Sequence, residues 1–272
     1  MDTSCVDNTN TNTNTNTNTN TNTNINNLHH HIETEHALLS GRYIKNIVYG
    51  GLDGIITTFS IISASYGAGF ELKLIIIMGV ANLIADGFSM GLGDFFSSYF
   101  ENLYILSEKE KEEYEYINNK EYEVTEMVEL YEQQGLEHED AQKIVDIVAA
   151  PKYHSYFIKT MVNYELGLEI PEGDYTKQNM KEGSITFGSF VSFGFIPVLP
   201  YIIFYSSGYD QQTNIFIIDC FITSIAMFFL GYTQAKITKQ SKIKYGAIMC
   251  INGSFAALCA FLIGFGLERA LS

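Results

Sequence analysis

The chain has 272 residues, 46% of them hydrophobic, and its 31 acidic against 16 basic residues give a formal net charge of −15. This balance makes nucleic acid an unfavourable partner, because phosphate binding needs clustered Lys and Arg. The four cysteines, none in a Cys-x-x-Cys spacing, exclude a disulfide-rich secreted scaffold. Cations are the natural ligands of such an acidic chain.

The composition of the first 40 residues is typical of a polar tail. Residues 8–24 alternate Asn and Thr, a low-complexity tract that buries too little apolar surface to order itself. Four His follow between positions 29 and 36, with Glu33 and Glu35 among them, and either weak metal capture or simple solvation would suit them. We predict a disordered tail over residues 1–40 and no signal peptide, since no basic region precedes an apolar core.

Five stretches approach the length of about 20 apolar residues that a membrane-spanning helix needs. They have few or no charges and cover residues 44–66, 74–97, 184–206, 213–233 and 246–267. The third contains Pro197 and Pro200, a break that neighbouring helices tolerate inside a membrane bundle. The sequence predicts an all-α membrane protein with five transmembrane helices, two within residues 41–100 and three within residues 183–272.

The distribution of basic residues predicts the orientation of these spans. With five spans the two termini lie on opposite sides of the membrane. If the N-terminus, residues 101–182 and the last connection share one side, the other side holds only Lys73 and Arg269. The positive-inside rule makes the first side cytosolic. We therefore expect a cytosolic N-terminus and a C-terminus in the lumen of an organelle.

Residues 101–182, between the second and third spans, hold 20 acidic residues and 8 Lys. Hydrophobic periodicity, Gly135 and Pro151 predict three helices here, at about 121–134, 137–150 and 152–168. Because these helices have an apolar face, we predict a small folded cytosolic domain and not a linker.

The second span has no helix breaker after Gly93, so one long helix is predicted over residues 74–118. At 100° per residue, a stripe about 80° wide collects most of its acids. The stripe consists of Asp86, Met90, Asp94, Glu101, Glu108, Glu112 and Glu115. Carboxylates one turn apart repel each other, and a divalent cation would offset the repulsion. An ordinary solvated helix face is the alternative for the glutamates beyond the membrane.

The acids at membrane depth favour a functional interpretation, because such a group costs about 2.5–3.5 kcal/mol to insert. Met90 adds a thioether that favours a transition metal. Asp53 lies in the first span, with Asn46 one heptad earlier. An unpaired Asp there would be protonated or metal-bound, as in an exchanger, and an Asp hydrogen-bonded within the bundle is the alternative. Asp219 is a second candidate acid with no assigned partner.

The last predicted helix of the acidic domain offers Met161 and Glu165 one turn apart. This face could close over the glutamate stripe and complete a metal site. Packing of Met161 in the domain core is the alternative interpretation.

Four short motifs, the five spans and the acidic insert together make residues 40–270 resemble the vacuolar iron transporter family, which includes related manganese and calcium transporters. The motifs, in chain order, are Asp53-Gly54, Ser89-Met90-Gly91-Leu92-Gly93, Tyr164-Glu165-Leu166-Gly167-Leu168-Glu169 and Pro197-Val198-Leu199-Pro200-Tyr201. The resemblance implies a homodimer of five-helix subunits that exchanges cytosolic Fe²⁺ for lumenal protons across the membrane of an acidic, vacuole-like organelle, for iron storage and detoxification. Its partners would be divalent ions, protons, lipid and its own second copy, and no enzymatic activity is expected.

The resemblance also implies roles for individual residues. Asp53 and Met90 would line the ion pathway. A cytosolic metal-binding domain would use Glu from the extended helix and a Met/Glu pair from the last one, with Fe²⁺, Mn²⁺, Zn²⁺ or Co²⁺ as candidate ions. These ligands fall on Glu101, Glu108, Glu112, Glu115, Met161 and Glu165.

Three positions depart from the family pattern, which has acids at the places of Asn46 and Asn82 and a second Met at that of Val162. Asp86 would compensate for Asn82. The departures leave open a Mn²⁺-preferring or uncoupled carrier, and a membrane-anchored metal sensor is an alternative of a different class. A di-iron enzyme is disfavoured, because the only Glu-x-x-His lies in the tail. Two Gly-x-x-x-Gly pairs, Gly50/Gly54 and Gly87/Gly91, would permit dimerisation through the first two spans.

Overall fold

Helices account for the regular structure in the computed structural model, which describes residues 43–209 and 211–271, and no strand occurs within those ranges. The residues from Asn46 onward belong to one compact unit. The predicted disordered tail, residues 1–40, lies outside the described residues.

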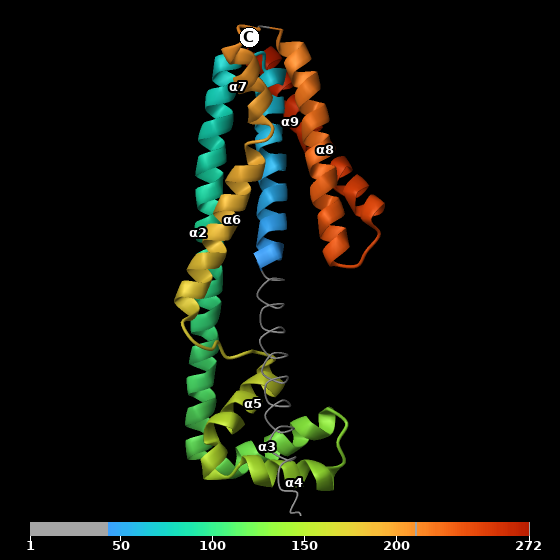
Figure 1. Cartoon of the computed structure of the whole chain (residues 1–272). Helices are drawn as coiled ribbons and strands as arrows, with labels where there is room; N and C mark the ends of the chain where they lie inside the picture. Colours follow the sequence, from blue (N-terminus) through green and yellow to red (C-terminus); the bar gives the residue numbers. More distant parts are fainter. Residues whose placement is uncertain (1–42, 210, 272) are drawn as a thin grey trace, which may run out of the picture. The chain divides into compact units, whose positions relative to one another are not determined.

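Four helices are long and apolar enough to cross a membrane: Tyr43–Gly67, α2 (Leu72–Asn118), α8 (Gln212–Ile237) and α9 (Lys242–Leu271). Two shorter helices, α6 (Tyr175–Gly194) and α7 (Val198–Ser206), qualify together as one span bent by 49° (Figure 1). The bend falls at Pro197, the residue just before α7, as the sequence predicted. These candidates agree with the five predicted stretches when the bent pair counts as one span.

The helix α2 continues unbroken well beyond its apolar half. Its last turns contact α3 (Lys120–Gln133) and α5 (His154–Leu166), and α4 (His138–Val148) packs against those two helices, with the 3₁₀ turn η1 (Pro151–Tyr153) before α5 (Figure 1). We call the part of the chain over residues 101–182 the acidic domain.

Local signals set the ends of these short helices. Gly135 and Gly167 follow α3 and α5 with positive φ angles of 101° and 66°, a backbone region that favours glycine. Pro151 follows α4 and begins η1. The three helices predicted for this region are therefore confirmed to within a few residues.

An apolar core holds the acidic domain together. Met127 of α3, Val145 of α4, and Phe157 and Met161 of α5 are fully buried in it. Tyr116 joins the core from α2, and its hydroxyl donates a hydrogen bond to the carbonyl oxygen of Ala149. Because α2 contributes to this core, the extension of the second span is a structural part of the domain.

Glycines allow α6 to approach two membrane helices closely. A Cβ atom added at Gly50 would lie 2.8 Å from the carbonyl oxygen of Thr186, and one added at Gly91 would lie 2.8 Å from that of Gly183. Gly54 and Gly87 likewise face Phe190 of α6. The Gly-x-x-x-Gly pairs thus serve contacts within the chain. The interpretation of them as a surface for a second copy is not supported, because α6 occupies that surface.

Candidate functional site

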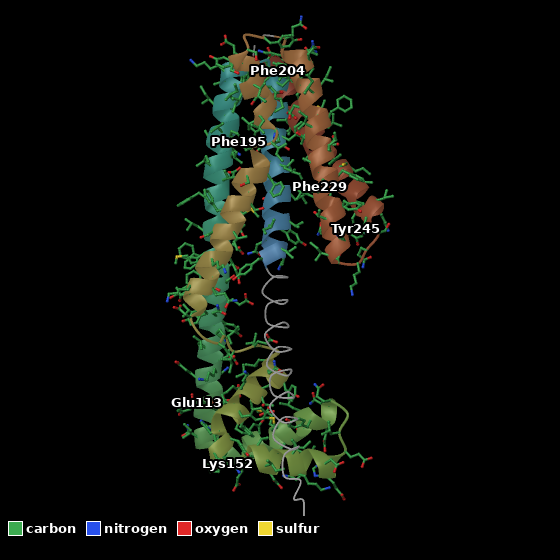
Figure 2. The ribbon with its side chains drawn as sticks, viewed as in Figure 1. Glu113, Lys152, Phe195, Phe204, Phe229 and Tyr245 are labelled. Carbon is green, nitrogen blue, oxygen red and sulfur yellow. The ribbon has the colours of Figure 1, made fainter. Side chains whose placement is uncertain are left out.

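Three helices of the acidic domain bring six glutamates together, each within electrostatic reach of at least one other member. We call this set the glutamate cluster. It consists of Glu108, Glu112 and Glu115 on α2, Glu123 and Glu126 on α3, and Glu165 on α5. In Figure 2 the labelled Glu113 and Lys152 mark this end of α2 and the adjoining turn η1.

Two members of the cluster are buried despite their charge. Glu112 and Glu123 are each only 3% exposed, and Oε2 of Glu112 has no hydrogen-bond partner within the described structure. Burial, together with repulsion from neighbouring carboxylates, raises the pKa of each of these side chains to about 7. Both groups therefore hold or release a proton readily near neutral pH, and a cation could replace that proton.

The remaining members of the cluster are more exposed to solvent than Glu112 and Glu123. Burial and the charges of Glu126 and Glu115 raise the pKa of Glu165, although Lys111 opposes the shift. Glu108 accepts a hydrogen bond from Nζ of Lys111 at 3.2 Å. Lys111 is thus the basic side chain that partly offsets the negative charge at this side of the cluster.

The structure brings together four of the five α2 and α5 glutamates that the sequence singled out and separates one. Glu101 is exposed and lies eleven residues before Glu112, about 16 Å along the helix axis. Glu123 and Glu126 were missed by the sequence reasoning. A repeated spacing, Glu112-x-x-Glu115 followed by Glu123-x-x-Glu126, was the signal that could have found them.

Met161 is fully buried in the apolar core of the domain, as the alternative sequence interpretation had it. Its role as a metal ligand stays a prediction. Within residues 43–209 and 211–271, no three His, Cys, Asp or Glu side chains converge tightly enough to hold one metal ion. Binding a cation would therefore require the glutamates to rotate toward one another, which their long side chains permit.

Side chains from two neighbouring helices donate hydrogen bonds to Asp94 in the apolar half of α2. Asn46 donates a hydrogen bond from Nδ2 to Oδ2 of Asp94 at 3.2 Å, and Thr186 of α6 donates one from Oγ1 to the same oxygen at 2.6 Å. The neutral side chain at position 46 thus acts as a donor to an acid on the facing helix. An acid at position 46 would repel Asp94 instead.

A second group of predicted residues lies around Asp86. This residue is eight positions before Asp94 on α2, about 12 Å away along the helix axis. Asp86 accepts a hydrogen bond from Nδ2 of Asn82 and interacts electrostatically with the carboxyl of Asp53. Asp53 is exposed on the described chain, and Met90 is half-buried on α2 between Asp86 and Asp94. The structure therefore brings together Asp53, Asp86 and Asn82, and places Asn46 and Asp94 in a separate pair.

Comparison with known proteins gives consistent matches over most of the chain. The model of the VIT family matches residues 44–265. Relatives named vacuolar iron transporter occur in Toxoplasma gondii, 34% identical over 85% of this chain and 76% of that protein, and in Plasmodium falciparum, 35% identical over 84% of each. Vacuolar iron transporter 1 of Arabidopsis thaliana is 27% identical over 87% of this chain and 90% of that protein.

All three relatives are named transporters, in agreement with the expectation that this protein is not an enzyme. The resemblance found in the sequence motifs is confirmed by the match, which extends from the first candidate span to the last. The chain belongs to the VIT family.

Proposed function

We propose that the protein moves Fe²⁺ from the cytosol into an acidic, vacuole-like organelle in exchange for protons. The observation that carries this proposal is the pair of buried glutamates, Glu112 and Glu123, in a cluster of six carboxyl groups whose negative charge the nearby Lys111 offsets only in part. The names of the relatives supply iron as the substrate.

Capture is the first step that we propose. The glutamate cluster collects a divalent cation from the cytosol, because each carboxylate that binds the metal is relieved of repulsion from its neighbours. Glu112 and Glu123 release protons when the metal binds, since a carboxylate must be deprotonated to act as a ligand. Fe²⁺ is the substrate, and Mn²⁺, Zn²⁺ and Co²⁺ are further candidates for this cluster.

Passage through the membrane would follow the acids of α2 and the facing helix. The continuous helix α2 carries both the glutamate cluster and the membrane acids Asp94 and Asp86. From Asp94 the ion would pass Met90, whose thioether favours Fe²⁺ over Ca²⁺ or Mg²⁺, to Asp86 and Asp53. Protons taken from the acidic lumen by Asp53 and Asp86 would displace the metal there.

A homodimer is part of this proposal. Asp53 is exposed on the described chain, although it lies in a candidate membrane span. An acid that faces lipid costs about 2.5–3.5 kcal/mol on insertion scales. A second copy covering this face would place two Asp53 side chains beside a shared pathway and remove them from lipid.

The test is Fe²⁺ uptake into proteoliposomes that hold the purified protein, with lumenal pH recorded in the same vesicles. Uptake with matching alkalinisation of an acidic lumen is the expected result. Uptake without a pH change would show that the protein is an uncoupled carrier and not an antiporter. The neutral side chains of Asn46 and Asn82 favour that alternative. Binding of Fe²⁺ with no uptake would make the protein a membrane-anchored metal sensor. Competition with Mn²⁺ in the same assay establishes the ion preference.

A further inference from the structure

The helix α8 carries one carboxyl group that the proposed pathway does not use. Asp219 is completely buried, although it lies within a candidate membrane span. Its Oδ1 accepts a hydrogen bond from Oγ1 of Thr223 at 3.0 Å, and its Oδ2 has no hydrogen-bond partner within the described residues. A buried carboxyl with one oxygen unpartnered needs a proton or a cation, because charge is costly in an apolar interior.

Asp219 lies between two apolar clusters. Ile215, one turn before it, belongs to a cluster with Ile62 and Tyr201, and Met227, two turns after it, belongs to a cluster with Ile55. The helix Tyr43–Gly67 therefore contributes apolar side chains on both sides of the turn of α8 that carries Asp219.

Three hydroxyl groups near this part of the molecule are also buried and without a hydrogen-bond partner in the described structure. They belong to Thr58 and Ser63 on the Tyr43–Gly67 helix and to Tyr201 on α7. The Tyr201 hydroxyl lies close enough to Asp219 for the two groups to interact electrostatically. Since buried polar groups are normally hydrogen-bonded, four unpartnered oxygens in this region indicate a place for water or an exchangeable proton.

No basic side chain is available at this depth in the described parts of the surrounding helices. The titratable groups around Asp219 are Tyr66 on the Tyr43–Gly67 helix, Tyr201 on α7, Cys220 on α8 and Cys250 on α9. The basic residues of α8 and α9 lie at their ends, at Lys236, Lys242, Lys244 and Arg269. A salt bridge therefore does not compensate Asp219, and the neutral acid is the stable form.

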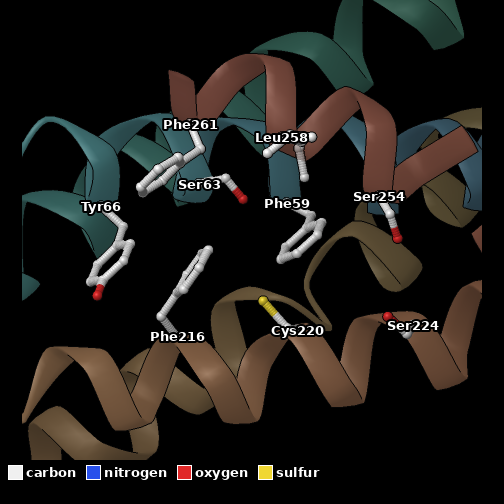
Figure 3. Close-up of a pocket in the computed structure, with 10 residues that line it drawn as sticks. Phe59, Ser63, Tyr66, Phe216, Cys220, Ser224, Ser254, Leu258 and Phe261 are labelled. Atoms are coloured by element: carbon white, nitrogen blue, oxygen red, sulfur yellow. The ribbon is translucent and has the colours of Figure 1, made fainter. Parts of the chain in front are cut away.

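A cavity of about 440 Å³ adjoins the same turns of α8. Figure 3 shows Ser63, Tyr66 and Cys220 among the side chains around it, and Ser224 and Ser254 also line it. Its volume exceeds the roughly 30 Å³ that a water molecule occupies in the liquid. Water in this cavity would have Ser63 as a polar partner and would lie beside Cys220, the residue that follows Asp219 on α8.

We propose that Asp219 is a second proton-binding site of the transporter, loaded from the cavity and separate from the metal pathway. The inference rests on the proposed proton exchange. Asp53 and Thr58 lie on the same helix five residues apart, about 140° around its axis, with Asp53 exposed and Thr58 buried. Asp53 therefore points away from the buried side of that helix, on which Thr58 lies.

The first test compares Asp219→Asn with the wild type in the proteoliposome assay, with protons counted per Fe²⁺. The amide resembles the neutral acid, so the variant should fold. We expect the number of protons per Fe²⁺ to fall by at least one half, while Co²⁺ binding by the glutamate cluster changes less than twofold. Asp140→Asn, the same chemical change at an exposed acid of α4, is the matched control and should leave the ratio unchanged.

An unchanged ratio in Asp219→Asn would overturn the inference while leaving the proposed exchange intact. Uptake by the wild type without any pH change would overturn the proposed exchange itself. A second readout needs no transport. In the Glu112→Gln/Glu123→Gln background, which lacks the two glutamates that also hold protons near neutral pH, infrared spectra of the purified protein should contain a carbonyl band of a protonated carboxyl that disappears when Asp219→Asn is added. Persistence of that band in the variant would show that Asp219 is not the buried acid that holds the proton.

Discussion

The acids of the acidic domain and those of the membrane helices are stabilised in opposite ways. In the domain, Glu112 and Glu123 are buried among other carboxylates, which raises the pKa of both. At membrane depth, Asp86 and Asp94 each accept a hydrogen bond from a neutral Asn or Thr side chain. The domain therefore concentrates negative charge, and the membrane helices disperse it among neutral donors.

This difference suits two separate tasks. Mutual repulsion in the glutamate cluster is removed when a divalent cation binds, so the cluster gains affinity for metal from the strain of its metal-free form. Neutral donors hold a membrane carboxylate in place without neutralising it. A Lys or Arg in the same place would neutralise the carboxylate. Such a carboxylate stays available to a passing cation or a proton.

The largest expected effect is that of Asp53→Ala. We expect Fe²⁺ uptake into proteoliposomes to fall to the level of protein-free vesicles, because the pathway loses its exposed membrane acid. The purified variant should keep the helical circular dichroism and the elution volume of the wild type. Uptake close to that of the wild type would remove Asp53 from the pathway.

A double change in the glutamate cluster should have the next largest effect. In Glu112→Gln/Glu123→Gln the apparent affinity for Fe²⁺ should fall about 10- to 100-fold, the range seen when groups that support a metal site are lost. Glu101→Gln is the matched control, since Glu101 is exposed and apart from the cluster, and its effect should stay below twofold. Initial uptake rates over a range of Fe²⁺ concentrations measure this. A loss confined to the maximal rate would contradict the capture role.

The buried glutamates also predict how stability depends on pH. Folding raises the pKa of Glu112 from 4.5 to about 7, so the native state binds more protons than the unfolded state between these values. Stability of the metal-free protein is therefore lost as the pH rises through this range, by up to about 3 kcal/mol for this carboxyl.

The measurement is the Tm of metal-free wild type and Glu112→Gln at pH 5 and pH 8. Relative to the wild type, the variant should gain stability between pH 5 and pH 8, because its amide does not ionise. Saturating Co²⁺ should raise the Tm of the wild type at pH 8 more than at pH 5. If the Tm difference between the variant and the wild type is the same at pH 5 and pH 8, Glu112 is not the titrating group.

The smallest effect is expected at the N-terminus. Deletion of residues 1–28, which include the Asn/Thr tract, should leave Fe²⁺ uptake and its apparent affinity unchanged, because no part of the proposed pathway lies there. The same uptake assay measures this. A loss of more than about half of the transport rate would assign a function to the tail.

Sequence alone was sufficient for the features that depend on neighbouring residues. The candidate spans, the bend at Pro197 and the helix ends at Gly135, Pro151 and Gly167 follow from hydrophobic runs and from the backbone preferences of Pro and Gly. The family followed from the order of several short motifs. Each of these signals is contained within a few residues or within one helix, so no knowledge of distant contacts was needed.

Tertiary structure decided which side chains meet. Glu123 and Glu126 join the glutamate cluster because α3 folds back onto α2, and the helical stripe that included Glu101 could not reveal that fold. The donors to Asp94 come from residues 48 positions before it and 92 after it. Periodicity along one helix fixes the direction of a side chain but not its partner, because the partner depends on how separate helices pack. The buried Asp219 is the clearest case, since the apolar contacts of Ile215 and Met227 set its surroundings.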